Sequence, residues 1–334
     1  MTNSKKPKRS SNAKVGGKEI KQKKQVTNEL SLGDAISRLS SRDWRLLIDL
    51  YLCRVMPQNV IIDTFFLDSP ELYYREYESA DEEGREQLVI KNRNRAVIKG
   101  RRTLRELQIA GLTESTKMIP DEMDKPVHLR KSVRGESWYY LTARGLRVVE
   151  TKIGAIEESK LSKVELDMER AKKDHIWELG KVYLDLRYNW MVKFPEFVQF
   201  QDWDWHPSLT VYSDNQTMEI RPDSVLRIGE QLLYVELDRS TEPVQRSPFY
   251  SNQVSIKMKL ERYRSVMKLT TNPIQRSGII AFILPEAVKN TRLENIQKAA
   301  DDVFKGEQKV FVGRTIGDII MKLVTVEDSS YETP

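Results

Sequence analysis

The stretch Arg221–Pro243, RPDSVLRIGEQLLYVELDRSTEP, holds three carboxylates on two short apolar segments. Asp223 lies on the first segment, and Glu236 and Asp238 lie at the end of the second. Residues two apart on a strand face the same side, so Glu236 and Asp238 point together, and a hairpin can place Asp223 across from them. Gathered carboxylates repel one another and are costly to desolvate. A divalent cation or a long basic side chain is therefore expected between them.

The segments around this stretch predict an α/β arrangement. A helical stretch at about 159–193 precedes four strand-like segments, FVQFQDWDW, MEIRPDSVLRI, QLLYVELD and GIIAFILP. Helical patterns follow the third and fourth segments, and the strand KVFVG comes last, which gives the order α, β, β, β, α, β, α, β. On the helix NQVSIKMKLERYRSVMK, Lys259 and Tyr263 are one turn apart. A lysine near paired carboxylates suits phosphate chemistry, because it can stabilise developing negative charge.

The preceding part of the chain predicts a winged helix-turn-helix. SSRDWRLLIDLYLCRVM has apolar residues at helical spacing after a Ser/Asp start, and PQNVIIDTFFL predicts a second helix. The stretch SPELYYREYESADEEGREQLVI is expected to be a polar insertion, with partial helicity left open, before a third helix in NRNRAVIKGRRTLRELQIAGLTES. SWYYLTARGLRVVE predicts a strand, a cap at Thr142 and a further helix, and residues 113–137 before it predict a strand pair with a long polar tip. In a winged helix the third helix enters the DNA major groove, and the hairpin touches the backbone.

The third helix has a basic stripe. Arg95, Lys99 and Arg102 stand at i, i+4 and i+7, opposite Val97 and Leu104. We expect this stripe to contact DNA. The alternative is that it only solvates an exposed helix face.

Composition and charge narrow the class of protein further. The chain has 334 residues, enough for two domains, and carries +6 overall. Residues 1–25 alone carry +8, so residues 26–334 carry −2, and the basic tail is expected to be disordered and to attract polyanions. No apolar run reaches the length of a membrane span, and the single Cys53 excludes an internal disulfide, which favours a cytoplasmic protein. No P-loop or GxGxxG motif is present, which argues against a nucleotide-powered enzyme.

The pattern PD–x12–ExD and the order of elements resemble the PD-(D/E)XK nuclease superfamily, with its restriction-endonuclease-like fold. Pro222-Asp223 matches the first acidic position and Glu236 the second, but Asp238 stands where that superfamily has a lysine. In such nucleases the lysine can come from the next helix, where Lys259 is the candidate. KLERY is similar to the Q-x-x-x-Y helix of some relatives, with Lys259 in place of the glutamine.

The two halves together resemble a narrower group, the replication-relaxation family of plasmids and mobile elements. The likeness covers roughly residues 40–285 and includes RRTLRELQIAGL, YYLTARGLRVV, DHIWELGKVYLDL, RPD, VELDRSTE and KLERY. It implies a role in processing DNA.

The sequence therefore predicts an α+β or α/β multidomain protein. It divides into a disordered basic tail (1–30), a winged-helix DNA-binding domain (31–155) and a PD-(D/E)XK nuclease-like domain (156–330). The expected function is plasmid replication, relaxation or mobilisation by relaxase-like nicking of one DNA strand, dependent on Mg²⁺ or Mn²⁺. The expected partner is plasmid or mobile-element origin DNA, and a homodimer is left open.

The expected site has several roles. Asp223 and Glu236 would hold the metal with Asp238 nearby, Lys259 would stabilise charge, and Tyr263 would position a phosphate or orient the lysine. His175 and Glu178 on the leading helix are weaker candidates.

Two alternatives remain at this stage. The carboxylates could form a structural cluster satisfied by Arg221, Arg239 or Lys259, with Tyr263 packed in the core. The protein would then be a non-catalytic origin-binding replication or mobilisation factor, with a degenerate nuclease fold as a platform. The missing lysine at the third motif position favours this alternative.

Overall fold

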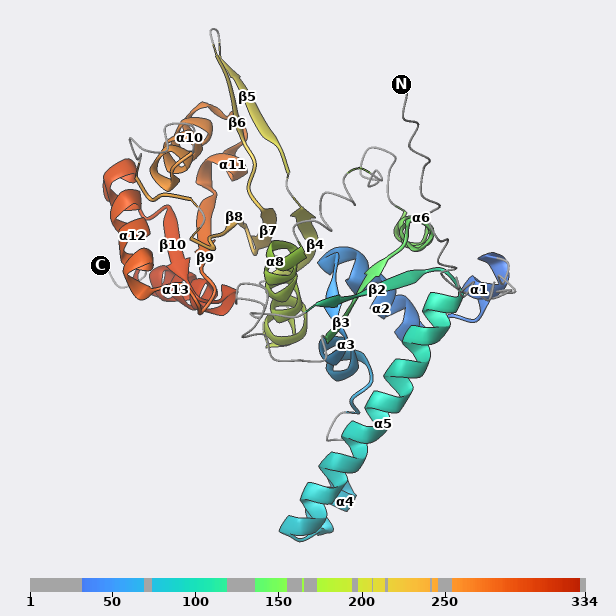
Figure 1. The fold of residues 1–334 in the computed structure, drawn as a ribbon. Coiled ribbons are helices and arrows are strands. Elements are labelled where there is room, and N and C mark those ends of the chain that lie inside the picture. The colour runs from blue at the N-terminus through green and yellow to red at the C-terminus, as the bar shows by residue number, and fades with distance from the viewer. Residues whose placement is uncertain are drawn as a thin grey trace, which may run out of the picture.

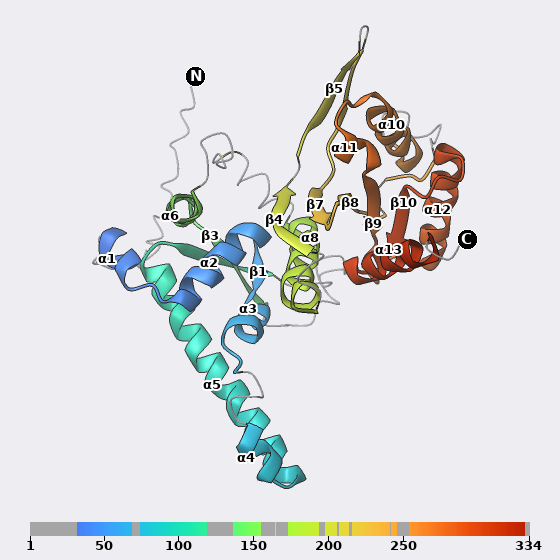
Figure 2. The ribbon, with the colours of Figure 1, turned by 180° about the vertical axis from the view of Figure 1, so that it is seen from behind.

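The computed structural model of the chain describes residues 32–68, 74–118, 136–154, 164, 173–193, 198–205, 207–213, 216–240, 242–245 and 254–330. The expected basic tail and most of the expected hairpin tip lie outside these residues. The described chain is a mixed α+β protein with a three-stranded, a five-stranded and a two-stranded sheet, as the sequence predicts at this coarse level. Figures 1 and 2 show helix α8 (Lys173–Asp185) between two groups of elements.

The first group surrounds the three-stranded sheet, whose strand order is β1-β3-β2. Its elements are α1 (Leu32–Ser37), α2 (Ser41–Cys53), β1 (Met56–Pro57), α3 (Gln58–Phe65), α4 (Tyr74–Ser79), α5 (Glu82–Ile109), β2 (Thr113–Met118), β3 (Glu136–Leu141) and α6 (Ala143–Ile153). β2 and β3 pair antiparallel, so the expected succession of helix, helix, basic helix, hairpin and helix is observed.

Helix α5 is longer than the sequence pattern indicates. From residue 74 on, the polar stretch whose helicity the sequence leaves open forms α4 and the first turns of α5. Asp81 caps α5, because its Oδ1 accepts a hydrogen bond from the Gly84 N–H (2.9 Å). Figure 1 shows the N-terminal end of α5 projecting away from the sheet beside α4.

Local capping signals set where α2 and α6 begin. Ser40 and Asp43 form a reciprocal capping box at the start of α2. Thr142 caps α6 by accepting from the Gly145 N–H (2.9 Å). A Cβ atom on Gly145 would lie 2.0 Å from the carbonyl oxygen of Leu112, so only glycine allows α6 to approach the start of β2 this closely.

The second group is built on the five-stranded sheet. Its elements, with α8, are the π-helical turn η4 (Leu186–Trp190), α9 (Met191–Lys193), β4 (Val198–Trp205), β5 (Leu209–Ser213), β6 (Gln216–Ile220), β7 (Ser224–Ile228), β8 (Gln231–Leu237), α10 (Ile256–Leu269), α11 (Pro273–Ser277), β9 (Ile279–Ile283), α12 (Asn290–Phe304), β10 (Val310–Gly313) and α13 (Ile316–Ser330). Within the described part of the chain, no helix has the length and apolar character needed to cross a bilayer.

The five-stranded sheet has the order β10-β9-β8-β7-β4. β10, β9 and β8 run parallel, whereas β7 is antiparallel to both of its neighbours. Alternate residues of β8 enter two different apolar clusters. Leu233 and Val235 pack on the side of α8 and α13, and Leu232 and Tyr234 pack on the side of α10 and α12.

The segment expected as one strand, MEIRPDSVLRI, is divided into β6 and β7 by Arg221, Pro222 and Asp223. Pro222 cannot donate to a strand ladder, which accounts for a break at this point. β6 pairs with β5 in a separate two-stranded hairpin that lies along α10. Asp223 therefore stands just before β7 rather than inside a strand.

A two-residue turn joins β7 to β8. Ile228 pairs with Gln231, and between them Gly229 has a positive φ of 57°. Glycine accepts this backbone conformation without steric cost, so the turn is tight and fixes the pairing of the two strands.

A continuous apolar core links the two groups across α8. Gly180 of α8 lies against α2, where a Cβ atom would come within 3.1 Å of the Cys53 carbonyl oxygen. Cys53 is buried, and its thiol contacts the Gly180 carbonyl (3.6 Å). The division at residues 155 and 156 stays a prediction, because the core itself does not stop there.

A buried carboxylate reinforces this junction. Asp49 of α2 is fully buried, and its Oδ1 accepts from the hydroxyl of Tyr183 on α8 (2.8 Å). Tyr188 donates to Oδ2, and Arg187 Nε lies 3.2 Å from Oδ1. Tyr188 and Arg187 both belong to η4, so the π-helical turn carries two of the three partners. Burial raises the pKa of Asp49, and these three partners oppose that rise.

Replacing Asp49 by alanine should destabilise the whole chain by about 3 kcal/mol, because it removes the buried carboxylate that Arg187 and two tyrosine hydroxyls share. Urea unfolding followed by circular dichroism measures the loss. Asp43→Ala, which removes only the Asp43 half of the α2 capping box, is the matched control and should cost about 1 kcal/mol. Equal costs for the two variants would show that the buried network contributes nothing of its own.

Candidate functional site

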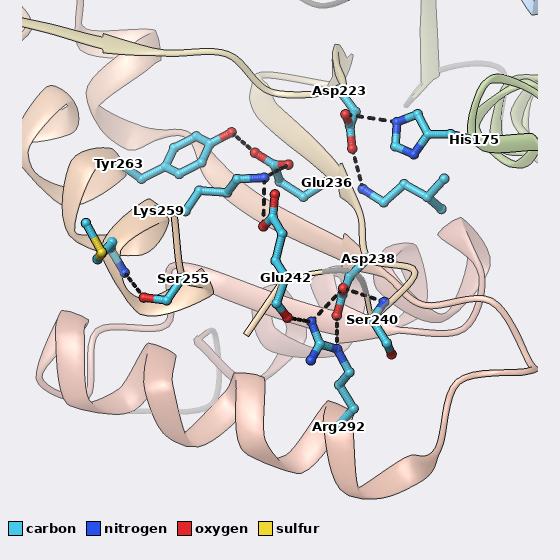
Figure 3. A network of polar contacts seen from close by, with 12 residues as sticks. His175, Asp223, Glu236, Asp238, Ser240, Glu242, Ser255, Lys259, Tyr263 and Arg292 are labelled. Atoms are coloured by element: carbon cyan, nitrogen blue, oxygen red, sulfur yellow. Dashed lines mark hydrogen bonds and ion pairs between the residues drawn. The ribbon is translucent and has the colours of Figure 1, made fainter. Parts of the chain in front are cut away.

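The candidate site forms where β7 begins and β8 ends (Figure 3). Ser224 pairs with Val235, so the next step of the antiparallel register sets Asp223 opposite Glu236. Helix α8 approaches this point from one side of the sheet and α10 from the other. The site therefore combines two strand ends with side chains from both helical layers.

Glu236 is the most buried carboxylate of the site, with 2% of its surface exposed. Its Oε1 accepts a hydrogen bond from the hydroxyl of Tyr263 (2.6 Å), and its Oε2 accepts from Lys259 Nζ (2.9 Å). Burial raises the pKa of Glu236 to about 7, with the Lys259 ammonium opposing and the Asp223 charge adding to the rise.

Lys259 stands between carboxylates. Besides Glu236, its Nζ lies 3.6 Å from Glu242 Oε2. Burial disfavours the ammonium, but the negative charges of Glu236 and Glu242 outweigh it and raise the pKa of Lys259 above its ordinary value. Lys259 is therefore a cation at neutral pH. A quarter of its side chain is exposed, so the ammonium can meet a ligand.

Asp223 is held by groups on both sides. His175 Nε2 of α8 lies 3.1 Å from Oδ1, and the Leu237 N–H donates to Oδ2 (2.8 Å). Burial opposes ionisation of Asp223, yet the hydrogen bond and charge of His175 and the Leu237 amide together lower its pKa. Because an ionised carboxylate only accepts, Nε2 carries the proton of this contact. Of the two weaker sequence candidates, His175 thus joins the site, whereas Glu178 pairs with Lys181 (2.6 Å).

Asp238 faces the same side of the sheet as Glu236, as the strand alternation predicts, but it has a different partner. Arg292 of α12 grips its carboxylate with two contacts, Nε to Oδ2 at 2.5 Å and Nη2 to Oδ1 at 2.8 Å. Arg292 Nη2 also donates to the Glu242 carbonyl (2.6 Å). No local sequence signal points to Arg292, because it lies 54 positions from Asp238. Arg221, which the structural alternative considered as a partner, pairs instead with Glu219 (2.8 Å).

A cavity of about 460 Å³ opens over these groups. Asp223, Glu236, Asp238 and Lys259 line it together with His175, Leu237, Arg239, Glu242, Ile256 and Phe282. Tyr263 is not among the lining residues; it is 1% exposed and reaches the site through its hydroxyl on Glu236. The structure thus brings four of the five candidate catalytic residues to one cavity and places the fifth beneath it.

The donor set fits a hard divalent cation that also has ligands from outside the protein. Among the described residues, no group of three or more His, Cys, Asp or Glu has the geometry of a metal site. Mg²⁺, however, is commonly held by one or two carboxylates plus water and substrate phosphate. Asp223 and Glu236 can provide such a pair, provided that Lys259 yields its place on Glu236 Oε2.

The predicted basic stripe is exposed on α5, in the other group of elements. Arg95, Lys99 and Arg102 are exposed, whereas Leu104 and Leu107 of the opposite face are buried. Lys99 lies 3.9 Å from Asp68 and Arg102 pairs with Glu106 at 2.9 Å, both on the surface. Arg101 and Arg105 extend the exposed basic face beyond the predicted stripe.

The fold and the two sites define a mixed α+β protein with an exposed basic helix and a separate carboxylate–lysine cavity. The family model described as Replication-relaxation matches residues 87–282, more than half of the chain. The chain therefore belongs to the replication-relaxation family. The matched region runs from α5 into β9, so it includes the basic stripe, Asp223, Glu236 and Lys259, whereas Arg292 lies beyond it.

Two further comparisons add little. No curated protein matches the chain. Among solved structures, the chain is similar to protein VC1899 from Vibrio cholerae, with 10% identity and a TM-score of 0.30. The match covers 86% of this chain and 59% of that one. A TM-score this low does not establish a shared fold.

Glu236 should make stability depend on pH when divalent cations are removed with EDTA. Its pKa is about 7 in the folded protein, against an ordinary value of 4.5. The contribution of Glu236 to stability is therefore fully present below about pH 4.5 and is lost as the pH rises through about 7. Glu236→Gln should flatten this decline by roughly 1–3 kcal/mol in urea titrations across that range.

The matched control is Glu230→Gln, because Glu230 is exposed on the β7–β8 turn. It should keep the wild-type profile. If the stability of the wild type and of Glu236→Gln declined in parallel with pH, the pH dependence would not come from Glu236.

Proposed function

We propose that this protein binds plasmid or mobile-element DNA and nicks one strand in a divalent-cation-dependent reaction. The observation that carries the proposal is the meeting of Asp223, Glu236 and Lys259 in one cavity. Two carboxylates and a lysine at the ends of neighbouring strands are the set that the PD-(D/E)XK resemblance implies. Here the lysine comes from α10 instead of the third motif position.

Each side chain has a definite task in this proposal. Asp223 and Glu236 would hold Mg²⁺ or Mn²⁺, which when bound polarises the phosphoryl oxygen and lowers the pKa of a bound water. Lys259, freed from Glu236, stabilises the charge that develops on the phosphate. Tyr263 keeps Glu236 oriented, and His175 does the same for Asp223.

The DNA-binding part of the proposal rests on α5. Helices α2 and α3, the basic face of α5 and the β2–β3 hairpin follow the order of a winged helix-turn-helix. The exposed stripe of Arg95, Lys99 and Arg102 is then the face presented to the major groove. We propose the winged helix for residues 31–155 and the nuclease-like domain for residues 156–330.

A second candidate function is a non-catalytic origin-binding factor with the nuclease-like half as a platform. One observation favours it: both oxygens of Glu236 are already satisfied, by Tyr263 and Lys259. The carboxylate of Asp238 is likewise held by Arg292. A closed network of this kind is stable without a cation.

Replacing Arg95, Lys99 and Arg102 together by alanine should weaken DNA binding by a few kcal/mol, because each side chain that touches a phosphate or a base contributes roughly 1 kcal/mol. The measurement is an electrophoretic shift at fixed salt, with folding checked by circular dichroism. Lys193, Lys268 and Lys298 are exposed in the other half of the chain, and their triple alanine variant is the charge-matched control. If both triple variants bind alike, the DNA does not lie on α5.

Manganese should raise the melting temperature of the wild type and support nicking of supercoiled plasmid. At a hundred times the dissociation constant the stabilisation should be roughly 3 kcal/mol. Glu236→Ala should abolish both effects and leave DNA binding by α5 nearly intact, whereas Glu230→Ala should retain them. DNA binding without nicking and without a manganese-dependent rise would reject the nuclease and support the platform.

A further inference from the structure

A second cavity of about 590 Å³ adjoins the carboxylate–lysine cavity. Arg239 lines both, so the two spaces meet at this side chain. The other lining residues come from α8, the segment after β8, the connection between β9 and α12, and the start of α12.

The free charge of this second cavity is positive. Arg239 and Lys289 are both exposed, and neither has a side-chain hydrogen bond or ion pair within the described residues. The remaining charged groups are neutralised: Glu178 pairs with Lys181 (2.6 Å), and Arg292 pairs with Asp238 (2.5 Å). An anion entering the cavity therefore meets two cations that no other group in the described part of the chain neutralises.

The backbone on both sides of Arg239 is held by contacts of Asp238 and Ser240. The Asp238 N–H donates to the Ile283 carbonyl (3.0 Å), and Arg292 clamps the Asp238 side chain. The Ser240 N–H donates a hydrogen bond to Asp238 Oδ1 (2.9 Å), and Ser240 has a positive φ of 65°. Figure 3 shows this network around Asp238 next to the pair of Lys259 and Glu236. The backbone on either side of Arg239 is thus fixed between the two cavities, and the exposed side chain extends from this fixed point.

We infer that the second cavity binds the backbone phosphates of a single DNA strand next to the position of cleavage. This inference rests on the proposed function, which places the scissile phosphate in the first cavity. A strand leaving that cavity passes Arg239, whose planar guanidinium fork suits a phosphate, and then reaches Lys289. Thr291 and Asn295 offer polar contacts, and Val244 and Val288 offer apolar surface for sugar or base.

The test uses the full chain with Arg95, Lys99 and Arg102 replaced by alanine, so that binding through α5 is minimised. Fluorescence anisotropy then measures the affinity for a labelled single-stranded 12-nucleotide DNA as a function of salt. Arg239→Gln with Lys289→Gln should lower the affinity about tenfold. It should also reduce the slope of log K against log salt by about 1.4, at about 0.7 for each phosphate contact on a single strand.

Lys298→Gln, an exposed lysine further along α12, is the control and should change neither the affinity nor the slope. Arg239→Lys keeps the charge but loses the fork, so it should retain most of the salt slope even if the glutamine variant folds poorly. The inference is overturned if the double variant binds with the affinity and slope of Lys298→Gln. Nicking is scored separately, so an inactive wild type would reject the proposed function while the anisotropy data still decide the strand-binding role.

Discussion

Helix α8 is held at its two ends by two carboxylates, and the rest of the structure depends on that arrangement. Near its start, His175 contacts Asp223 of the candidate site. Near its end, Tyr183 donates to the buried Asp49 of α2, and η4 adds Tyr188 and Arg187 to the same acceptor. A buried carboxylate is tolerated only when it is fully satisfied, so Asp49 strongly constrains how α2 and α8 meet. The basic helix and the carboxylate–lysine cavity are thereby built on one shared core.

The candidate site shows how one sheet end can keep several acids close without leaving any of them unsatisfied. Each carboxylate has its own cationic or hydrogen-bonding partner from a different helix: α8 for Asp223, α10 for Glu236 and α12 for Asp238. These partners offset the repulsion between neighbouring carboxylates, which is still felt where the Asp223 charge raises the pKa of Glu236. Of these partners, Lys259 and His175 also line the cavity, so their contacts are the ones that a ligand can exchange.

Local patterns in the sequence are enough to find much of this architecture. The caps at Ser40 and Thr142, the alternation along β8 and the helical spacing of Lys259 and Tyr263 all follow from neighbours in the chain. The strand alternation and the helical spacing point to Asp223, Glu236 and Lys259 as members of the site. Local patterns miss Arg292 and Asp49, because the partners of these residues lie 54 and more than 130 positions away. At Pro222 the pattern predicts a continuous strand where the structure has a break, and the pattern does not locate the start of α5 at Asp81. The strand break and the helix start each depend on one or two residues, and the longer apolar or polar pattern around them does not reveal these residues.

The tight turn at Gly229 has a consequence for reading related sequences. Because Ile228 pairs with Gln231, the length of the twelve-residue segment between Asp223 and Glu236 fixes the strand register that places the two carboxylates opposite each other. Adding or removing one residue in that interval would shift the pairing by one position and turn one carboxylate away from the other. A relative could then keep every acidic residue and the lysine and still lack the site. For a related sequence, the spacing between these residues therefore decides whether they can meet as much as the residues themselves do.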